Sequence, residues 1–176
     1  MSRVGRPIPE IDDLALDQCV AALAPLFEGA PRFLARLCAA RPFIDAGQLF
    51  ESARRIAQAM PDEEQVELID AHPRLGAPPG SVSAASFVEQ GYDRAVAEGA
   101  ATAESVRLAA ELERLNTTYE ARFGFRYCVF VAGRSRAALL PEFEAALSAD
   151  PAGERARALE AVVDIAADRL RAQTGG

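Results

Sequence analysis

The feature of this sequence that most constrains its fold is the spacing of its apolar residues, which recur three and four positions apart through most of the chain. An α-helix turns once every ~3.6 residues, so this spacing lines up apolar side chains on one helix face. We therefore predict an all-α protein. The expected helices span residues 14–27, 31–40, 46–60, 63–71, 86–96, 103–122, 137–147 and 153–172.

The ends of several expected helices carry recognisable signals. Asp45 and Asp62 are predicted N-caps, and Pro31 suits the first turn of a helix. Residues 75–82 are rich in Pro and Gly and predict a loop. Residues 127–131 look like a strand but have no pairing partner nearby, so we predict a buried extended segment or a helix start.

The chain of 176 residues is long enough for one core and close to the usual length of one domain. Half of its residues are hydrophobic and 26% are charged, which is typical of a folded globular protein. We expect a single domain over residues 1–176, built as one compact bundle of about eight helices. The longest apolar run, residues 127–133, is too short to cross a bilayer, so no membrane association is expected.

No sorting signal is recognised in the sequence, so we expect a cytoplasmic protein. Asp12 and Asp13 stand where a secretory signal needs apolar residues, and residues 172–176 match no familiar targeting signal. The cysteines, Cys19, Cys38 and Cys128, are odd in number and widely spaced among apolar residues. We expect buried thiols rather than a disulfide framework or a metal site.

Charge and composition exclude several classes of function. A net charge of −7 argues against nucleic acid as a partner, because that binding depends on a basic surface. All 19 basic residues are arginine, which rules out Schiff-base lysines and the P-loop lysine. With one histidine and no HExxH motif, no metal is expected.

The single histidine, His72, lies at the predicted end of a helix and precedes Pro73. A residue before proline is disfavoured in the helical region, so His72 is expected to leave the helix and point into the following loop. The partial negative charge of a helix carboxyl end favours imidazolium, which would tune His72 for acid–base work near neutral pH. An ordinary exposed or hydrogen-bonded loop histidine is the alternative.

A second candidate group comprises Ser86, Glu89 and Gln90, which share one face of a predicted helix through their i, i+3 and i+4 spacing. Their hydroxyl, carboxylate and carboxamide groups suit a small, flat, nitrogen-rich ring. Ser-x-x-Glu is equally the pattern of a capping box, in which Ser86 and Glu89 bind only backbone amides.

Together these elements resemble the 2-oxo-4-hydroxy-4-carboxy-5-ureidoimidazoline (OHCU) decarboxylases. The matching elements are Leu-Phe-Glu-Gly-Ala-Pro (26–31), Arg-Pro-Phe (41–43), Ala-His-Pro-Arg-Leu-Gly (71–76), Ser-Phe-Val-Glu-Gln (86–90), Leu-Asn-Thr-Thr-Tyr-Glu (115–120) and Phe-Gly-Phe (123–125). The resemblance covers most of the chain, and the combination is more specific than any one piece.

The resemblance implies an all-helical fold, a homodimer, and conversion of a small-molecule substrate, OHCU, to (S)-allantoin without a cofactor. It implies His72 as the catalytic histidine and Glu89 as its acidic partner. Ser86 and Gln90 would hold the substrate, and Pro73 would shape the pocket.

The sequence departs from the family pattern at Ala132, where the resemblance leads us to expect a substrate-binding arginine. Arg134 is the first substitute, because Gly133 before it can adopt positive φ and redirect the chain. Arg74 and Arg126 are further candidates, and Arg134 could instead be a solvated residue beside the next helix.

Three functions therefore stay open. The favoured one is OHCU decarboxylation in urate breakdown. A second is a related reaction on another ureido or carboxylated ring, which the residue Ala132 motivates. The third is a catalytically silent helical binding domain.

Overall fold

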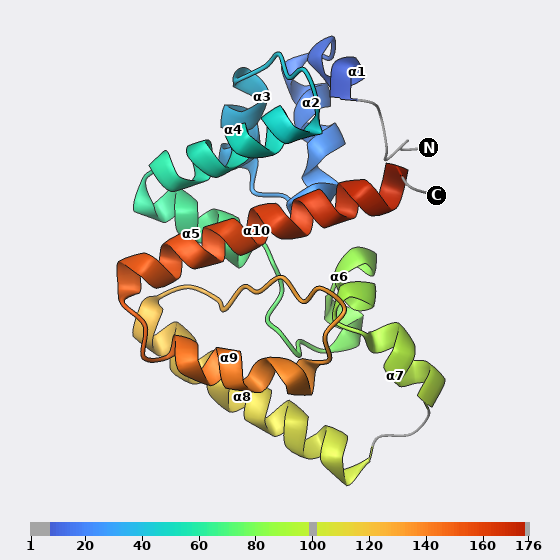
Figure 1. Cartoon of the computed structure of the whole chain (residues 1–176), viewed down its shortest axis with the longest axis vertical. Helices are drawn as coiled ribbons and strands as arrows, with labels where there is room; N and C mark the ends of the chain where they lie inside the picture. The colour runs from blue at the N-terminus through green and yellow to red at the C-terminus, as the bar shows by residue number, and fades with distance from the viewer. Residues whose placement is uncertain (1–7, 99–101, 175–176) are drawn as a thin grey trace. The chain divides into compact units, whose positions relative to one another are not determined.

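The structure is a computed structural model, and it describes residues 8–98 and 102–174 (Figure 1). Ten α-helices and two short 3₁₀ turns make up the secondary structure of this part of the chain. They are α1 (Ile8–Asp12), α2 (Leu16–Leu23), η1 (Ala24–Leu26), α3 (Pro31–Ala39), α4 (Ala46–Ala59), α5 (Asp62–Asp70), η2 (Pro79–Ser81), α6 (Ala84–Glu89), α7 (Tyr92–Glu98), α8 (Ala103–Phe123), α9 (Arg136–Ala146) and α10 (Pro151–Thr174).

The chain divides into two compact units. The first unit contains the described residues up to His72 and those from Leu159 onward, and the second contains Pro73–Ala158. Helix α10 begins in the second unit and ends in the first. That residues 1–176 form one domain stays a prediction.

The starts of α3 and α4 follow the predicted signals. Helix α3 begins with Pro31, and the carboxylate of Asp45 accepts a hydrogen bond from the backbone N–H of Gln48 at 2.8 Å. The prediction for Asp62 is wrong, because α5 begins at Asp62 itself and Pro61 stands at the cap position. The acidic first turn of α5 instead places carboxylates near the positive end of the helix dipole.

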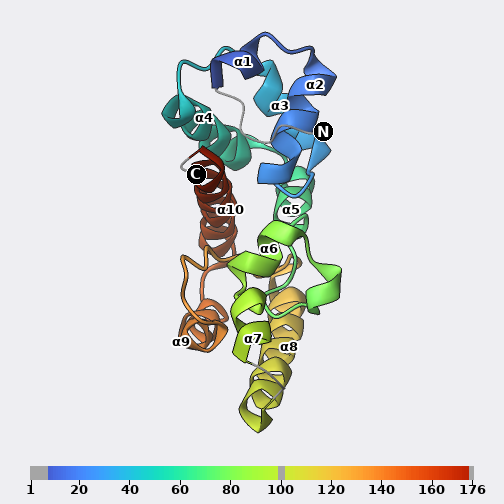
Figure 2. The ribbon, with the colours of Figure 1, turned by 90° about the vertical axis from the view of Figure 1, so that its right-hand side faces the viewer.

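The core of the first unit lies around helix α3. Helix α3 packs against α2, α4 and α5 (Figure 2). The rings of Phe27 and Phe33 meet edge to face, with their centroids 4.9 Å apart. The buried aliphatic residues of this unit include Leu23, Leu34, Leu37, Leu49, Leu68 and Ile69.

A disulfide joins α2 to α3, which corrects the expectation of three buried thiols. Cys19 and Cys38 are bonded, with their Cα atoms 6.1 Å apart, and both are buried. Packing of α2 on α3 brings these cysteines together across 19 positions of sequence, which their spacing alone does not indicate. Cys128 remains a buried thiol, as expected.

Arginines link neighbouring helices at the surface of the first unit. Arg36 on α3 donates to both carboxylate oxygens of Glu64 on α5, at 2.7 and 2.9 Å. Arg54 on α4 donates to Glu160 and Asp164 on α10, at 2.9 and 2.5 Å. Pairs this exposed each contribute up to about 1 kcal/mol, so the apolar core supplies most of the stability.

In the second unit, the helix predicted at residues 86–96 is two helices, α6 and α7. The break falls at Gly91, whose φ of +74° lies in the left-handed region. Such a residue ends an α-helix, and glycine adopts this conformation without a steric cost. Residue Gln90 therefore caps α6 instead of continuing a long helix.

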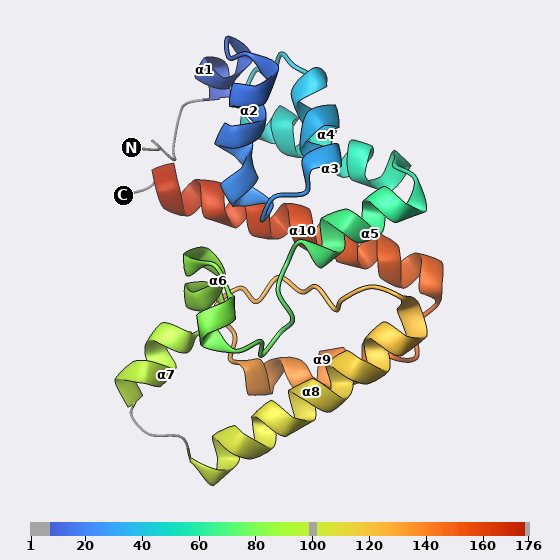
Figure 3. The same cartoon turned by 180° about the vertical axis from the view of Figure 1, so that it is seen from behind.

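Helices α8 and α9 lie side by side, with an extended segment between them in the sequence (Figure 3). Thr102 caps the start of α8 by accepting from the Ser105 N–H at 3.1 Å, and Gly124 ends the helix with a φ of +78°. Residues 127–131 are extended and mostly buried, as one of the two predicted alternatives stated.

The core of the second unit is aromatic. The ring of Tyr119 meets those of Tyr127 and Phe143 edge to face, and these two rings stack with centroids 3.7 Å apart. The Tyr119 hydroxyl donates to the buried carboxylate of Glu154 at 2.7 Å, and Arg157 also pairs with this carboxylate. Burial and the adjacent Glu154 raise the pKa of Tyr119 above its ordinary value, so the hydroxyl stays a donor.

The all-α prediction is confirmed, although the described chain has ten α-helices instead of about eight. The additional helices arise from α1 and from the break at Gly91. No helix in the described ranges has the length and apolar character needed to cross a membrane. Residues 175–176, which entered the argument about sorting signals, lie outside the described residues.

Candidate active site

His72 lies just beyond the carboxyl end of α5, in the first unit. Its backbone N–H donates to the carbonyl of Ile69 at 3.1 Å, which closes a last turn before Pro73. The side chain has left the helix, as Pro73 predicts, but it is only 4% exposed. The interpretation as an exposed loop histidine is therefore wrong.

The expected preference of His72 for the charged form is also wrong. Burial lowers the pKa of His72 to about 4, and the positive charge of Arg169 lowers it further. The charge of Glu28 and a hydrogen bond with the backbone of Leu68 act in the opposite direction but are smaller. Desolvation outweighs the partial charge of the helix end, so near neutral pH the imidazole is uncharged and can accept a proton.

Arg169 is a charged residue of the first unit that the sequence prediction did not include. Its guanidinium is buried and donates to Glu28 at 2.8 Å and to the carbonyl of Pro25 at 3.0 Å. A signal existed, because Arg169 interrupts the apolar stripe of the last predicted helix and Glu28 belongs to the element at residues 26–31. A buried arginine that acts on His72 is a candidate for binding an anion.

Ser86 lies inside α6 in the second unit and is 3% exposed. The cap of this helix is Ser83, whose hydroxyl accepts from the Ser86 N–H at 3.1 Å. Ser86 and Glu89 are therefore not a capping box, and that interpretation is wrong. Both residues share one helix face, and Glu89 is half-buried.

Gln90 directs both ends of its carboxamide to the loop that follows His72 in the sequence. Its Oε1 accepts from the Gly76 N–H at 2.7 Å, and its Nε2 donates to the Arg74 carbonyl at 3.1 Å. Gln90 is buried. Contact between Gln90 and a substrate stays a prediction, and its hydrogen bonds give it a second role in holding this loop.

Arg134 lies in the turn before α9, where Gly133 adopts a positive φ of +74°, which glycine can do without a steric cost. The Arg134 guanidinium donates to Glu142 at 2.7 Å and to the carbonyls of Phe130 and Val131. Its side chain is 42% exposed. Substrate binding by Arg134 stays a prediction, and substrate would compete there with Glu142.

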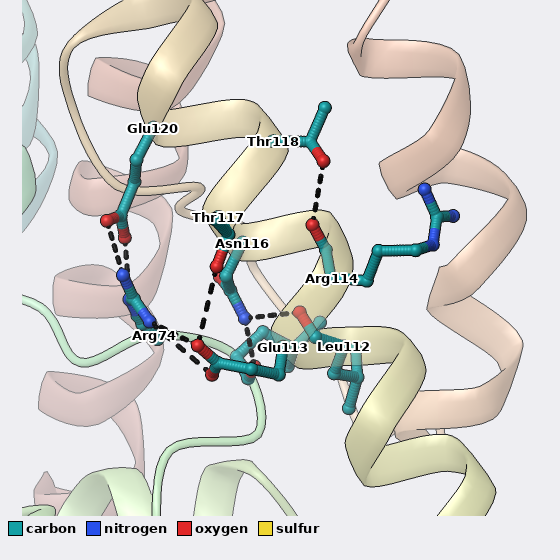
Figure 4. Close-up of polar contacts among 9 residues, drawn as sticks. Arg74, Leu112, Glu113, Arg114, Asn116, Thr117, Thr118 and Glu120 are labelled. Carbon is teal, nitrogen blue, oxygen red and sulfur yellow. Dashed lines mark hydrogen bonds and ion pairs between the residues drawn. The ribbon is translucent and has the colours of Figure 1, made fainter.

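The other two candidate arginines also lie in the second unit. Arg74 is paired with Glu120 and Glu113 of α8 (Figure 4). Arg126 is half-buried just before the extended segment. His72 belongs to the first unit, whereas Glu89 belongs to the second, so their proximity stays a prediction.

A buried, uncharged histidine such as His72 can act as a proton acceptor. Among the residues that the structure describes, no three His, Cys, Asp or Glu side chains gather as metal ligands. The fold and these residues define a class: a small all-helical enzyme whose candidate base is a buried, uncharged histidine. Comparison with known families makes this more specific.

The family model for OHCU decarboxylase matches residues 12–171, which is nearly the whole chain. This chain belongs to the OHCU decarboxylase family. The match includes His72, Ser86 and Glu89 and both compact units.

Relatives and solved structures agree with this assignment. The OHCU decarboxylase of Haloferax volcanii is 29% identical over 167 residues, which cover 93% of each chain. The enzyme of the same name from Amia calva is 26% identical over 167 residues, which cover 92% of this chain and 91% of that one. A crystal structure of OHCU decarboxylase in the presence of (S)-allantoin has the same fold, with a TM-score of 0.65 at 20% identity, covering 87% of this chain and 96% of that one.

Proposed function

We propose that this chain decarboxylates OHCU to (S)-allantoin in urate breakdown. The observation that carries the proposal is the family match over residues 12–171, which includes the buried histidine. Two relatives that align over more than nine-tenths of their length carry the name of this activity.

The substrate supplies its own electron sink. The ring carbon that bears the carboxylate and the hydroxyl neighbours a ring C=N bond. When the C–CO₂ bond breaks, its electron pair forms a C=C bond in the ring, and the imine nitrogen takes up a proton. Transfer of the hydroxyl proton away, and of a proton to the carbon bearing the ureido group, then gives allantoin. One proton from solvent replaces the departing CO₂.

His72 is proposed to take the hydroxyl proton. Its low pKa keeps the imidazole neutral near pH 7, which is the protonation state that a base needs. Glu89 is proposed to orient the imidazole or the ureido nitrogens, while Ser86 and Gln90 hold the ring and Pro73 shapes the pocket. The half-buried position of Glu89 and the burial of Ser86 support these roles.

We further propose that an arginine binds the substrate carboxylate, with Arg169 and Arg134 as the two candidates. The charge of Arg169 already acts on His72, and both belong to the first unit. The exposed side chain of Arg134 pairs with Glu142 and supports the turn before α9. If Arg169 is the binding residue, the carboxylate would share its guanidinium with Glu28.

The direct test is a coupled assay with freshly generated OHCU, which follows the appearance of optically active allantoin. Catalysis must exceed the spontaneous decay of OHCU in a matched sample without protein. His72→Asn should lose roughly 10²- to 10⁴-fold in kcat while keeping the helical circular dichroism spectrum. Racemic product at the spontaneous rate would contradict the proposal.

A second candidate is the same chemistry on a related ureido or carboxylated ring. The observation that favours it is Ala132, which adopts a φ of +50° and supplies no donor where the resemblance leads us to expect an arginine. A parent protein that is inactive on OHCU but decarboxylates such a ring would support it.

We propose a cytoplasmic homodimer that works without a cofactor and binds neither nucleic acid nor membrane. Light scattering coupled to size exclusion tests the dimer. Activity of protein dialysed against a chelator tests the independence from metal.

A further inference from the structure

The segment that directly follows His72 and Pro73 is held at each of four consecutive residues. Asn116 Nδ2 donates to the Leu75 carbonyl at 2.9 Å, and the Tyr92 hydroxyl donates to the Ala77 carbonyl. Gln90 holds the other two residues. It accepts a hydrogen bond from the Gly76 N–H and donates one to the Arg74 carbonyl. All of these contacts lie within the second unit.

One face of α8 provides much of this support. Leu112, Asn116 and Glu120 follow one another at intervals of four residues, so they project from the same side of the helix. Asn116 also donates to the Leu112 carbonyl at 2.8 Å, which fixes its carboxamide (Figure 4). A Cβ placed on Gly76 would come within 2.8 Å of the Leu112 side chain, so the loop lies directly against α8.

The Arg74 side chain reaches back to two carboxylates of α8 (Figure 4). Its Nε and Nη2 donate to the two oxygens of Glu120 at 2.7 and 2.5 Å, and its Nη1 donates to Glu113 at 3.1 Å. A forked pair of this kind restricts orientation as well as distance. These pairs hold the Arg74 guanidinium against α8.

We propose that Arg74, through its forked pair with Glu120, is a positioning residue for the proposed decarboxylation. The pair holds residue 74 on α8, at the start of the segment 74–77 to which His72 is joined through Pro73. Small errors in the placement of a reacting group have large effects on rate, because catalysis needs it near its attack geometry. This inference rests on the proposed function.

The test compares Arg74→Ala and Glu120→Gln with Arg114→Ala. Arg114 is a matched control, because it lies on α8 and makes a similar forked pair with Glu111 at the surface. We expect the first two variants to lose roughly ten- to 100-fold in kcat with KM changed less than twofold. Arg114→Ala should keep the parent kcat and KM.

The exchanged pair, Arg74→Glu with Glu120→Arg, separates positioning from folding. If the forked pair acts through orientation, the double variant should recover at least part of kcat. Backbone amide hydrogen exchange at residues 76–77 should also be slower in the double variant than in Arg74→Ala. A thermal melt of each variant shows how much stability has changed.

The outcomes are distinct. Unchanged kcat in Arg74→Ala, or an increase in KM alone, would overturn the positioning role, and the latter would make Arg74 a substrate contact. The positioning role would also be overturned if the double variant regained the parent melting temperature but not the lost kcat. An inactive parent protein would instead refute the proposed function itself.

Discussion

The guanidinium of Arg169 and the imidazole of His72 are both buried in the first unit, where the positive charge of Arg169 helps to keep the imidazole uncharged. Glu28 balances this charge through a 2.8 Å ion pair with Arg169. The residue proposed as base therefore owes its protonation state to burial first and to the neighbouring cation second.

The low pKa of His72 makes stability depend on pH. Below pH 6.5 the unfolded chain binds a proton at this histidine, whereas the folded protein does so only near pH 4. The free energy of unfolding should therefore fall by up to about 3 kcal/mol as the pH drops from 6.5 to 4, and this contribution should level off below that. Above pH 6.5 the contribution is fully present.

Denaturant unfolding of the parent and of His72→Asn across this range isolates the effect, because the carboxylates are common to both. The difference between the unfolding free energies of the two proteins should change steadily between pH 6.5 and pH 4. Parallel curves between pH 4 and 6.5 would show that His72 titrates alike in both states.

Arg169 and Arg134 can be separated by matched substitutions to glutamine. If Arg169 binds the substrate carboxylate, Arg169→Gln should remove one charge-assisted hydrogen bond to the substrate. The activation free energy that corresponds to kcat/KM should then rise by roughly 1.5 to 3 kcal/mol, whereas Arg134→Gln should change it little. Glu28→Gln is the control for folding, since it breaks the same buried ion pair but leaves the cation. The reverse ranking would identify Arg134 as the residue that binds the carboxylate.

The disulfide predicts the thiol count. Denatured, unreduced protein should show one reactive thiol, Cys128, and reduction should reveal three. Replacing both Cys19 and Cys38 by alanine should lower stability by about 2 to 4 kcal/mol, because the crosslink restricts the unfolded chain. Three thiols without reductant would contradict the bond.

Gly76 and Gly124 form a matched pair, because both have positive φ but only Gly76 lies against another side chain. Alanine at either position should cost roughly 1 kcal/mol from the backbone. At Gly76 the overlap with Leu112 should add about 1 to 3 kcal/mol. Melting temperatures test this ranking, and equal losses would mean that the loop yields to the added methyl group.

The sequence by itself determined the helical class and most helix positions, because the periodicity of apolar residues and caps such as Asp45 act locally. It also determined that His72 leaves its helix, because Pro73 restricts the residue before it. The break at Gly91 was missed because one glycine inside a periodic pattern does not reveal its φ.

Only the tertiary structure decided the burial of His72, and with it the direction of its pKa shift. It also paired Cys19 with Cys38, assigned the cap of α6 to Ser83, and joined Arg74 to Glu120 across 46 positions. Each of these depends on which helices pack together, and the energy of desolvating a charge or closing a long-range contact is not contained in local spacing.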